Sequence, residues 1–259
     1  MIQNKIDSFH LEDIKNDKHP SVFFKDANYD LFILRLPYFV TNDDVKYDSL
    51  AFVIDDENYF YYDKNEQKFI QHDTMHSFYH FIDKKVDNVL ELISFYSNEI
   101  ESIEDKIYEG ESIQKFNQKW FEYKTKLIRI HRVLNKAVET IQALIKSYKK
   151  EEDYLEKNFE DIYEHLTRSY RNAEHLLEKL DSIYNFNLNQ TNEQMNKIVY
   201  ILTLLSGIFL PLNLIVGFFG MNTTSLPFTQ ESGGTMNVIM VLLISGILAI
   251  GITFFMKRK

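Results

Sequence analysis

A stripe of polar and small residues along an apolar segment near the C-terminus has the clearest chemical potential. Starting at Asn196 and moving in steps of three or four, the stripe reaches Gly220, and such steps stay on one face of a helix. Amide and hydroxyl groups are costly in lipid and normally face protein or a water-filled cavity. The stripe therefore predicts either the wall of a polar passage or a close helix contact. Its members are Asn196, Val199, Thr203, Ser206, Leu210, Asn213, Gly217 and Gly220.

The stripe ends at Gly220-Met221-Asn222, within the stretch FFGMNTTSLP, which contains no Lys, Arg, Asp or Glu. None of these three residues is expected to be catalytic. The tripeptide forms either a simple turn or a neutral, polar end to the stripe.

Three histidines, His72, His76 and His80, are spaced four residues apart, so one helix face can carry all three. Imidazole suits Zn²⁺. The same spacing fits an ordinary surface or packing face at the start of a helix, with His72 outside it. Whether these histidines bind metal stays open.

Motifs for nucleotide chemistry and nucleophilic catalysis are absent from the sequence. It contains no P-loop, glycine-rich nucleotide motif or nucleophile elbow, so we expect no enzyme and no nucleotide partner. It contains no cysteine, which excludes disulfides and thiolate metal sites.

Two uncharged segments near the C-terminus are candidate membrane spans, and the first contains most of the stripe. Ile198 to Phe219 and Val238 to Met256 contain no charged residue, and as helices they would be about 33 and about 28 Å long, enough to cross a bilayer. Lys197 and the final Lys-Arg-Lys flank them, while the intervening loop has no Lys or Arg. Both termini are therefore expected in the cytoplasm, and the polar N-terminus does not resemble a signal peptide.

The second span lacks a polar stripe and offers only small contact residues, Ser245, Gly246, Ala249 and Gly251. One striped and one apolar span per chain cannot enclose a passage. If there is a pore, several copies must surround it, and a homo-oligomer follows.

The preceding part reads as a sheet followed by long helices. Apolar runs predict strands at 30–40, 50–54, 59–62 and 68–70, with Pro37 at an edge or bulge. The run at 30–40 is nearly continuous, as expected of a strand buried on both faces. Helical patterns cover 74–109 and 111–149, and a third begins near 152 without Pro or Gly before the first span. Apolar residues of the third pattern, from Phe159 to Ile183, are spaced mostly by three and four, which predicts a coiled-coil-like seam. A helix of sixty-odd residues, about 100 Å long, needs partners. Its asparagine-rich segment, 185–196, either breaks it or faces something polar.

Charge is concentrated in the same part of the chain. Residues 1–197 hold 37 of the 38 acidic and 26 of the 29 basic residues. An acidic body argues against nucleic acid and against lying flat on anionic lipid, while it permits attraction of cations.

Three segments resemble the CorA family of divalent-cation transport proteins. They are IFLPLNLIVGFFGMN (208–222), HPSVFFKDANYDLFILRLP (19–37) and NFEDIYEHL (158–166). The resemblance implies an α+β cytoplasmic domain, a very long stalk helix and two transmembrane helices, assembled as a funnel-shaped homopentameric channel in a bacterial-type inner membrane. The expected divisions are a shortened sheet domain 1–73, helical region 74–197, pore-lining span 198–219, external loop 220–237, second span 238–256 and basic tail 257–259.

The family resemblance also assigns roles to residues. Gly220, Met221 and Asn222 would form an entrance whose neutral oxygens accept hydrogen bonds from hydrated Mg²⁺, an ion that sheds water reluctantly. Leu202 would join the stripe as a pore residue and form a hydrophobic constriction, with Leu210 as the second one. Asn196 would lie at the cytoplasmic neck of the pore. The segment TNE at 191–193 is closer to the family's sequence around that position, but it needs a four-residue gap, and its Asn192 lies on the same helix face. Asp161 would bind a regulatory intracellular Mg²⁺ between subunits. Flux would be passive.

Departures from the family pattern leave the ion and the function class open. Asn213 stands where a threonine is usual, and the loop after Asn222 offers only Glu231 as an acid. A zinc-type branch shares this fold, so the cargo is Mg²⁺, with Co²⁺ and Ni²⁺ possible, or Zn²⁺. A different class is a membrane-anchored coiled-coil scaffold or sensor without transport, for which the stripe would serve packing only.

Overall fold

The computed structural model describes residues 2–40, 44–55, 58–110, 115–148, 155–221, 226 and 233–257. The chain divides into two compact units, Met1–Asn185 and Phe186–Lys259, and each is described by itself. Helix α4, Leu155–Phe219, contributes its first part to one unit and its second part to the other.

The first unit contains an antiparallel sheet whose five strands lie in chain order. The expected strands are all present, and the hairpin of β3 and β4 pairs Phe52 with Tyr61. The strands are β1 Val22–Lys25, β2 Asp30–Val40, β3 Asp44–Asp55, β4 Asn58–Asp63 and β5 Lys68–His72.

Strand β2 is apolar apart from Asp30 and Arg35 because both of its faces are covered. Phe32 and Leu34 point to a large core shared with the long helices, while Leu31 and Ile33 point to a smaller core closed by the N-terminal segment. Alternate residues of a strand face opposite sides of a sheet, so a strand buried on both faces has a nearly continuous apolar run.

Pro37 lies where β2 has a neighbour on one side only. Strand β1 pairs with β2 from Asp30 to Ile33, whereas β3 continues beside β2 as far as Val40. A proline cannot donate a backbone hydrogen bond, so it is tolerated along this free edge. The expected edge position is confirmed.

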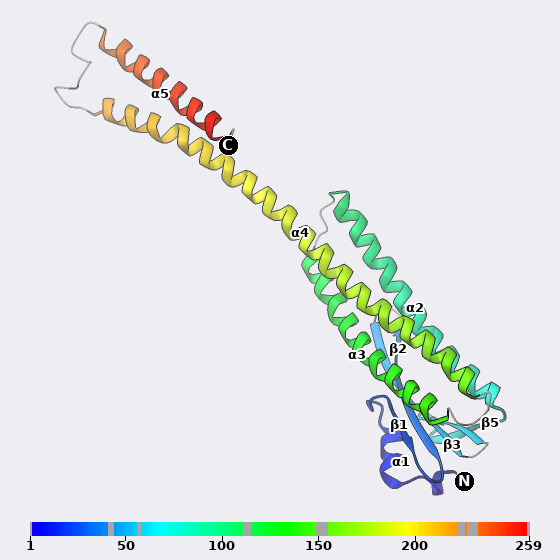
Figure 1. Ribbon diagram of the computed structural model, residues 1–259. Coiled ribbons are helices and arrows are strands. Elements are labelled where there is room, and N and C mark those ends of the chain that lie inside the picture. The colour runs from blue at the N-terminus through cyan, green and yellow to red at the C-terminus, as the bar shows by residue number, and fades with distance from the viewer. Residues whose placement is uncertain are drawn as a thin grey trace. The chain divides into compact units, whose positions relative to one another are not determined.

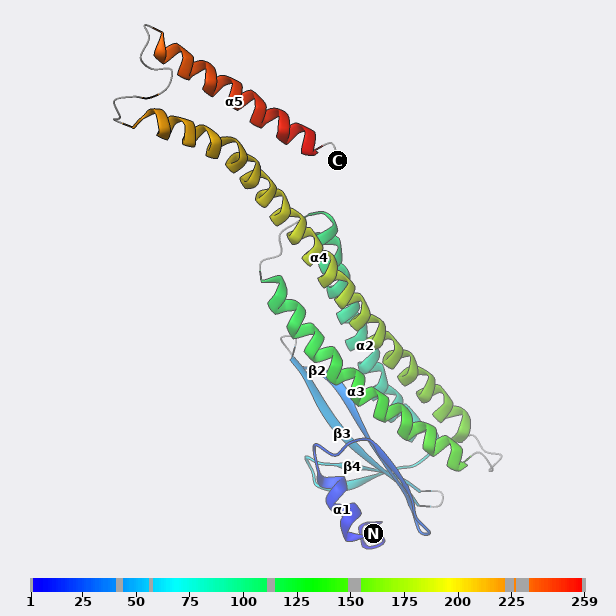
Figure 2. The same cartoon turned by 60° about the vertical axis from the view of Figure 1, so that its left-hand side comes forward.

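A short helix before the sheet was not expected from the sequence. Turn η1, Ile2–Asn4, and helix α1, Ser8–Lys15, cover the side of the sheet away from the long helices (Figures 1 and 2). Asp7 caps α1 by accepting a hydrogen bond from the Phe9 backbone N–H at 2.8 Å. Only Ile14 of α1 is buried, so eight residues give too weak an apolar periodicity to reveal a helix.

Three helices cover the other face of the sheet. They are α2 Met75–Tyr108, α3 Phe116–Tyr148 and the first part of α4, which lie side by side (Figure 1). Thr74 caps α2 by accepting from the Ser77 N–H, and Gly110, with φ +77°, follows the end of α2 in the left-handed conformation that glycine adopts freely. Both ends of α2 agree with the sequence prediction.

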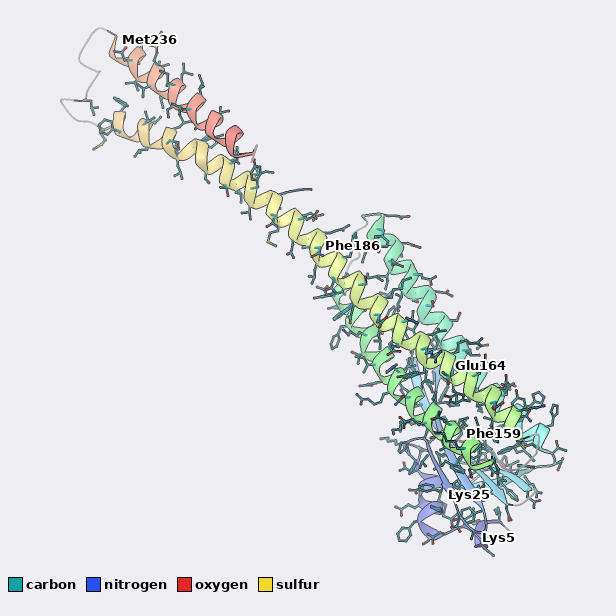
Figure 3. All side chains as sticks on the ribbon, in the orientation of Figure 1. Lys5, Lys25, Phe159, Glu164, Phe186 and Met236 are labelled. Carbon is teal, nitrogen blue, oxygen red and sulfur yellow. The ribbon has the colours of Figure 1, made fainter. Side chains whose placement is uncertain are left out.

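The first part of α4 buries the apolar seam predicted for it. Phe159, which Figure 3 labels on α4, reaches the sheet. Its ring meets that of Phe32 edge to face, with the ring centroids 5.8 Å apart. Ser169 fills the one gap in the seam, and its hydroxyl donates to the His165 carbonyl at 2.9 Å, which satisfies a polar group in the core. The buried apolar seam residues are Phe159, Ile162, Leu166, Ala173, Leu176, Leu180 and Ile183.

The second unit consists of the rest of α4 and helix α5, Gly234–Lys257, which run beside one another (Figures 1 and 2). The asparagine-rich segment remains helical, so of the two alternatives the break is wrong. Helix α5 begins at Gly234, four residues before the expected span. The expected span started at Val238, where the apolar run begins, whereas the helix also includes the polar residues Thr235 and Asn237.

Candidate functional site

Helix α5 lies against part of the apolar side of α4 and leaves the polar stripe uncovered, although the apolar residues Ile201, Leu205 and Leu214 are exposed as well. In the second unit, every stripe residue from Asn196 to Gly220 is exposed. A Cβ added at Gly246 of α5 would lie 3.9 Å from Leu212 Cδ2 of α4, which confirms Gly246 as a small contact position. By contrast, a Cβ at Gly251 would meet nothing within 4 Å. The partly covered positions of α4 are Leu204, Ile208, Pro211, Leu212, Ile215 and Phe219.

Thr203 lies at the border between the stripe and the α5 side. It contributes to a groove of about 710 Å³ between α4 and α5, which is otherwise mostly apolar. Its hydroxyl donates to the Val199 carbonyl at 2.8 Å, so the hydrogen of Thr203 is used within the helix. What Thr203 offers to another group is therefore its oxygen, as an acceptor.

The end of the stripe requires a glycine. The Gly220 N–H donates to the Val216 carbonyl at 2.8 Å, and a Cβ at Gly220 would lie 2.9 Å from that same backbone oxygen. Any larger residue would have to shift the end of the helix. Met221 follows with 55 % of its surface exposed, whereas Asn222 and Glu231 lie outside the described residues.

In the first unit, Asp161 is engaged by a neighbouring helix. The Tyr79 hydroxyl of α2 donates to Asp161 Oδ2 of α4 at 2.5 Å. Burial first, and then this hydrogen bond and nearby acids, raise the pKa of Tyr79. The other carboxylate oxygen, Oδ1, lies 3.8 Å from His165 Nε2, one turn further along α4.

Asp161 borders a cluster of possible metal ligands that the sequence did not single out. Asp83 and Asp87 of α2 and His165 of α4 place one ligand atom each within 4.8 Å of one another. Asp83 Oδ1 and His165 Nδ1 are buried, 3.9 Å apart, and neither has a hydrogen-bond partner within the described part of the chain. Two buried polar atoms at this separation are too far apart to satisfy each other.

The electrostatics of this cluster favour a cation. Burial raises the pKa of the Asp83 carboxyl, the charges of Asp87 and Asp161 raise it further, and His165 and His80 oppose the shift. Acids that repel one another gain most from a shared positive ion. Two carboxylates and one imidazole form a donor set that Mg²⁺, Co²⁺ or Zn²⁺ can use. We refer to Asp83, Asp87 and His165 as the metal centre.

The family of this chain follows from a match to a protein-family model. The model of the CorA-like Mg²⁺ transporter protein family matches residues 3–258, almost the whole chain. The chain belongs to the CorA family.

Relatives of this CorA-like chain are distant. It is 24 % identical over 188 residues to the cobalt/magnesium transport protein CorA of Thermotoga maritima, covering 70 % of this chain and 51 % of the relative. The chain spans about half the length of the curated relatives that it matches.

Solved structures share the fold. The complete CorA magnesium transporter of Methanocaldococcus jannaschii superposes with a TM-score of 0.78 at 20 % identity, covering 97 % of this chain and 84 % of that one. The ZntB cytoplasmic domain from Vibrio parahaemolyticus gives a TM-score of 0.52 at 14 % identity, covering 74 % and 82 %. Within the CorA-like chain, two described helices, α4 and α5, are long and apolar enough to cross a membrane.

The three histidines do not share one helix face. His72 is the last residue of β5, and its ring packs on Phe78 at 5.5 Å and Phe81 at 5.4 Å. Burial lowers the pKa of His72. Because the helix begins only at Met75, the interpretation that places all three histidines on one helix is wrong, and His76 and His80 remain as a pair.

Sequence signals for the metal centre did exist. Asp83 and Asp87 are four residues apart on α2, and Asp161 and His165 are four apart on α4. Each pair is common on exposed helices, so neither is informative alone. Only the packing of α2 against α4 brings the two pairs together.

Proposed function

We propose that this CorA-like chain forms a homopentameric channel for divalent cations, with Mg²⁺ as the main cargo and passive flux down its electrochemical gradient. One observation carries the proposal: α5 covers part of the apolar side of α4, whereas every residue of the stripe from Asn196 to Gly220 is exposed. In a membrane, an uncovered polar face must meet another protein surface or water.

The stripe supports a pore built from several copies of α4. Arranged around an axis, these helices would present Asn196, Ser206 and Asn213 as neutral rings of oxygen and nitrogen, with Leu202 and Leu210 as narrow apolar levels. Mg²⁺ keeps its waters tightly, so neutral acceptors can bind the hydrated ion without stripping it. The proposed entrance is Gly220-Met221-Asn222.

The proposed topology places both ends of the chain in the cytoplasm. Lys197 precedes the apolar part of α4, Lys257 is the last residue of α5, and Arg258 and Lys259 follow it, whereas 220–237 contains no Lys or Arg. Positive residues are retained on the cytoplasmic side. The acidic first unit would then face the cytoplasm of a bacterial-type cell, below the inner membrane.

We place gating at the metal centre and Asp161. Intracellular Mg²⁺ bound there would hold neighbouring copies in the closed arrangement, and its loss would release them. Asp161 keeps 44 % of its side chain exposed, so it is available to a second copy. Meanwhile Asp83 and His165 carry buried atoms that a cation would satisfy.

A zinc transporter is the second candidate. Residues 223–230, directly after the proposed entrance, contain no acidic residue, which weakens general attraction of cations at the mouth. Ion selection would then depend on hydration and ligand type rather than on charge.

Ion uptake into proteoliposomes tests the proposal. Full-length protein is reconstituted into liposomes that contain a fluorescent chelator. Mg²⁺, Co²⁺, Ni²⁺ and Zn²⁺ are then added outside in separate runs. We expect Mg²⁺ uptake that is lost in Asn222→Ala. Uptake of Zn²⁺ alone would select the second candidate, and a protein that assembles as a dimer without uptake would leave the scaffold as the better explanation.

A further inference from the structure

The first two turns of α2 carry a histidine pair that the proposed transport does not use. His76 Nε2 and His80 Nε2 are 3.0 Å apart, with ring centroids 4.2 Å apart and ring planes at 81°. Both side chains are exposed. A contact of this length arises either from one neutral ring donating to the other or from two nitrogens aimed at a common ion.

We propose that His76 and His80 together bind a transition-metal ion of the Zn²⁺, Co²⁺ or Ni²⁺ class, with water completing its coordination. Two metal–nitrogen bonds of about 2.1 Å span about 3.0 Å at a right angle and about 3.4 Å at the tetrahedral angle. The separation of 3.0 Å between the Nε2 atoms therefore already matches neighbouring positions of an octahedral ion.

The ligand type sets the ion class. Imidazole nitrogen suits Zn²⁺, Co²⁺ and Ni²⁺, whereas Mg²⁺ prefers oxygen ligands and keeps its water. The His76–His80 pair offers two nitrogens, while the metal centre offers two carboxylates and one nitrogen. The two sites would therefore sort cations by chemistry: Mg²⁺ competes at the metal centre and has little affinity for the histidine pair.

The surroundings of the pair compensate for its place at a helix N-terminus. The helix dipole disfavours a cation in the first turn. Asp73 lies just before α2, and Asp83 is close enough to His80 for the two to interact electrostatically. Asp83 therefore supplies negative charge close to the pair.

Zinc binding to the full-length, detergent-purified protein tests this site without reference to transport. Any affinity tag is removed, and Zn²⁺ is titrated against a chromophoric chelator about one unit above the ordinary imidazole pKa. The variants are His76→Gln and His80→Gln, singly and together. His175→Gln is the matched control, because His175 is a histidine on α4 with 78 % of its side chain exposed.

We expect each single variant to weaken this Zn²⁺ site at least about tenfold, since chelation needs both rings, and the double variant to lose little more. The His175 variant should bind as the wild type does, and excess Mg²⁺ should not displace the ion. Zn²⁺ binding of wild-type strength in the double variant would overturn the proposal and assign the contact to a hydrogen bond. Displacement by Mg²⁺ of the Zn²⁺ that the double variant fails to bind would overturn it as well, and a failure of ion flux would leave this binding result unaffected.

Discussion

Tyr79 of α2 and Asp161 of α4 are joined by a hydrogen bond of 2.5 Å from the phenol hydroxyl to Oδ2. The bond ties the proposed regulatory carboxylate to the helix that also carries Asp83 and Asp87. A shift of α2 against α4 would therefore change both the hold on Asp161 and the metal centre. A cation bound between these two helices would therefore change how α2 packs against α4.

Tyr79→Phe should lower the free energy of unfolding by about 1–2 kcal/mol in EDTA, because a hydrogen bond to a carboxylate is lost. Mg²⁺ should restore part of the loss, since Oδ2 of Asp161 becomes available as a ligand. Thermal unfolding of the full-length protein with and without Mg²⁺ measures both effects. Asp161→Asn combined with Tyr79→Phe completes a double-mutant cycle, and strictly additive losses would show that the bond contributes nothing.

Asp83→Asn should stabilise the protein in the absence of divalent cations. Burial and neighbouring acids raise the pKa of Asp83 above its ordinary value of 3.8, so the folded chain holds this proton more tightly than the unfolded chain does. The resulting stability is present below pH 3.8 and is lost as the pH rises through the raised pKa. At neutral pH the ionised carboxylate is therefore unfavourable.

We expect Asp83→Asn to gain about 0.5–1 kcal/mol at neutral pH in EDTA, similar to one surface charge interaction, and to lose most of the stabilisation by Mg²⁺. Unfolding temperatures across a Mg²⁺ titration provide the measurement. Glu122→Gln on α3 is a suitable control, because Glu122 forms an exposed pair with Lys126 within one helix. If both variants keep the wild-type response to Mg²⁺, the ion does not bind at the metal centre.

His72→Phe should make the free energy of unfolding depend less on pH in the acidic range. Burial lowers the pKa of His72 from its ordinary value of 6.5, and the Asp73 charge opposes this only in part. The unfolded chain then takes up the proton first, so the contribution is full above pH 6.5 and is lost as the pH falls through the lowered pKa. Phenylalanine keeps the ring contacts with Phe78 and Phe81.

The comparison is the change in unfolding free energy between neutral pH and about one to two units below the ordinary imidazole pKa. Wild type should lose more stability over this interval than His72→Phe does. His175→Gln should lose as much as wild type, since it removes an exposed ring. Parallel curves for all three proteins would mean that His72 titrates equally in the folded and unfolded chains.

The local pattern of apolar and polar residues was sufficient to predict most of the fold. The apolar run of β2 predicted a strand buried on both faces, and the spacing from Phe159 to Ile183 predicted the buried seam of α4. These features follow from the periods of strand and helix. Ser169 was missed because a buried hydroxyl looks polar in sequence, although the His165 carbonyl satisfies it. Helix α1 was missed because it buries a single residue.

The candidate site could be predicted only where it lies along one helix. The stripe from Asn196 to Gly220 follows from the helical period of α4, and the structure leaves it uncovered. The metal centre joins Asp83 to His165, which are far apart in sequence, so no local pattern contains it. His72 was grouped with His76 and His80 by spacing alone, and the strand boundary at β5 separates it.

Gly220→Ala should impair ion uptake far more than a glycine substitution elsewhere in the second unit. The added Cβ would lie 2.9 Å from the Val216 backbone oxygen, a contact that the end of α4 can relieve only by moving. Because Met221 and Asn222 follow directly, the shift would displace the proposed entrance. Gly251→Ala on α5 is the matched control, since its Cβ would meet nothing within 4 Å, and alanine is the better helix former by about 1 kcal/mol.

We expect Gly220→Ala to reduce initial Mg²⁺ uptake into proteoliposomes at least about tenfold, which corresponds to a barrier increase of about 1.4 kcal/mol. Gly251→Ala should transport at the wild-type rate with an equal or higher unfolding temperature. Chemical cross-linking of each variant, compared with wild type, checks that the assembly is intact. Wild-type uptake by Gly220→Ala would separate the glycine from the entrance, because the close contact at Val216 would then be relieved without any effect on the ion path.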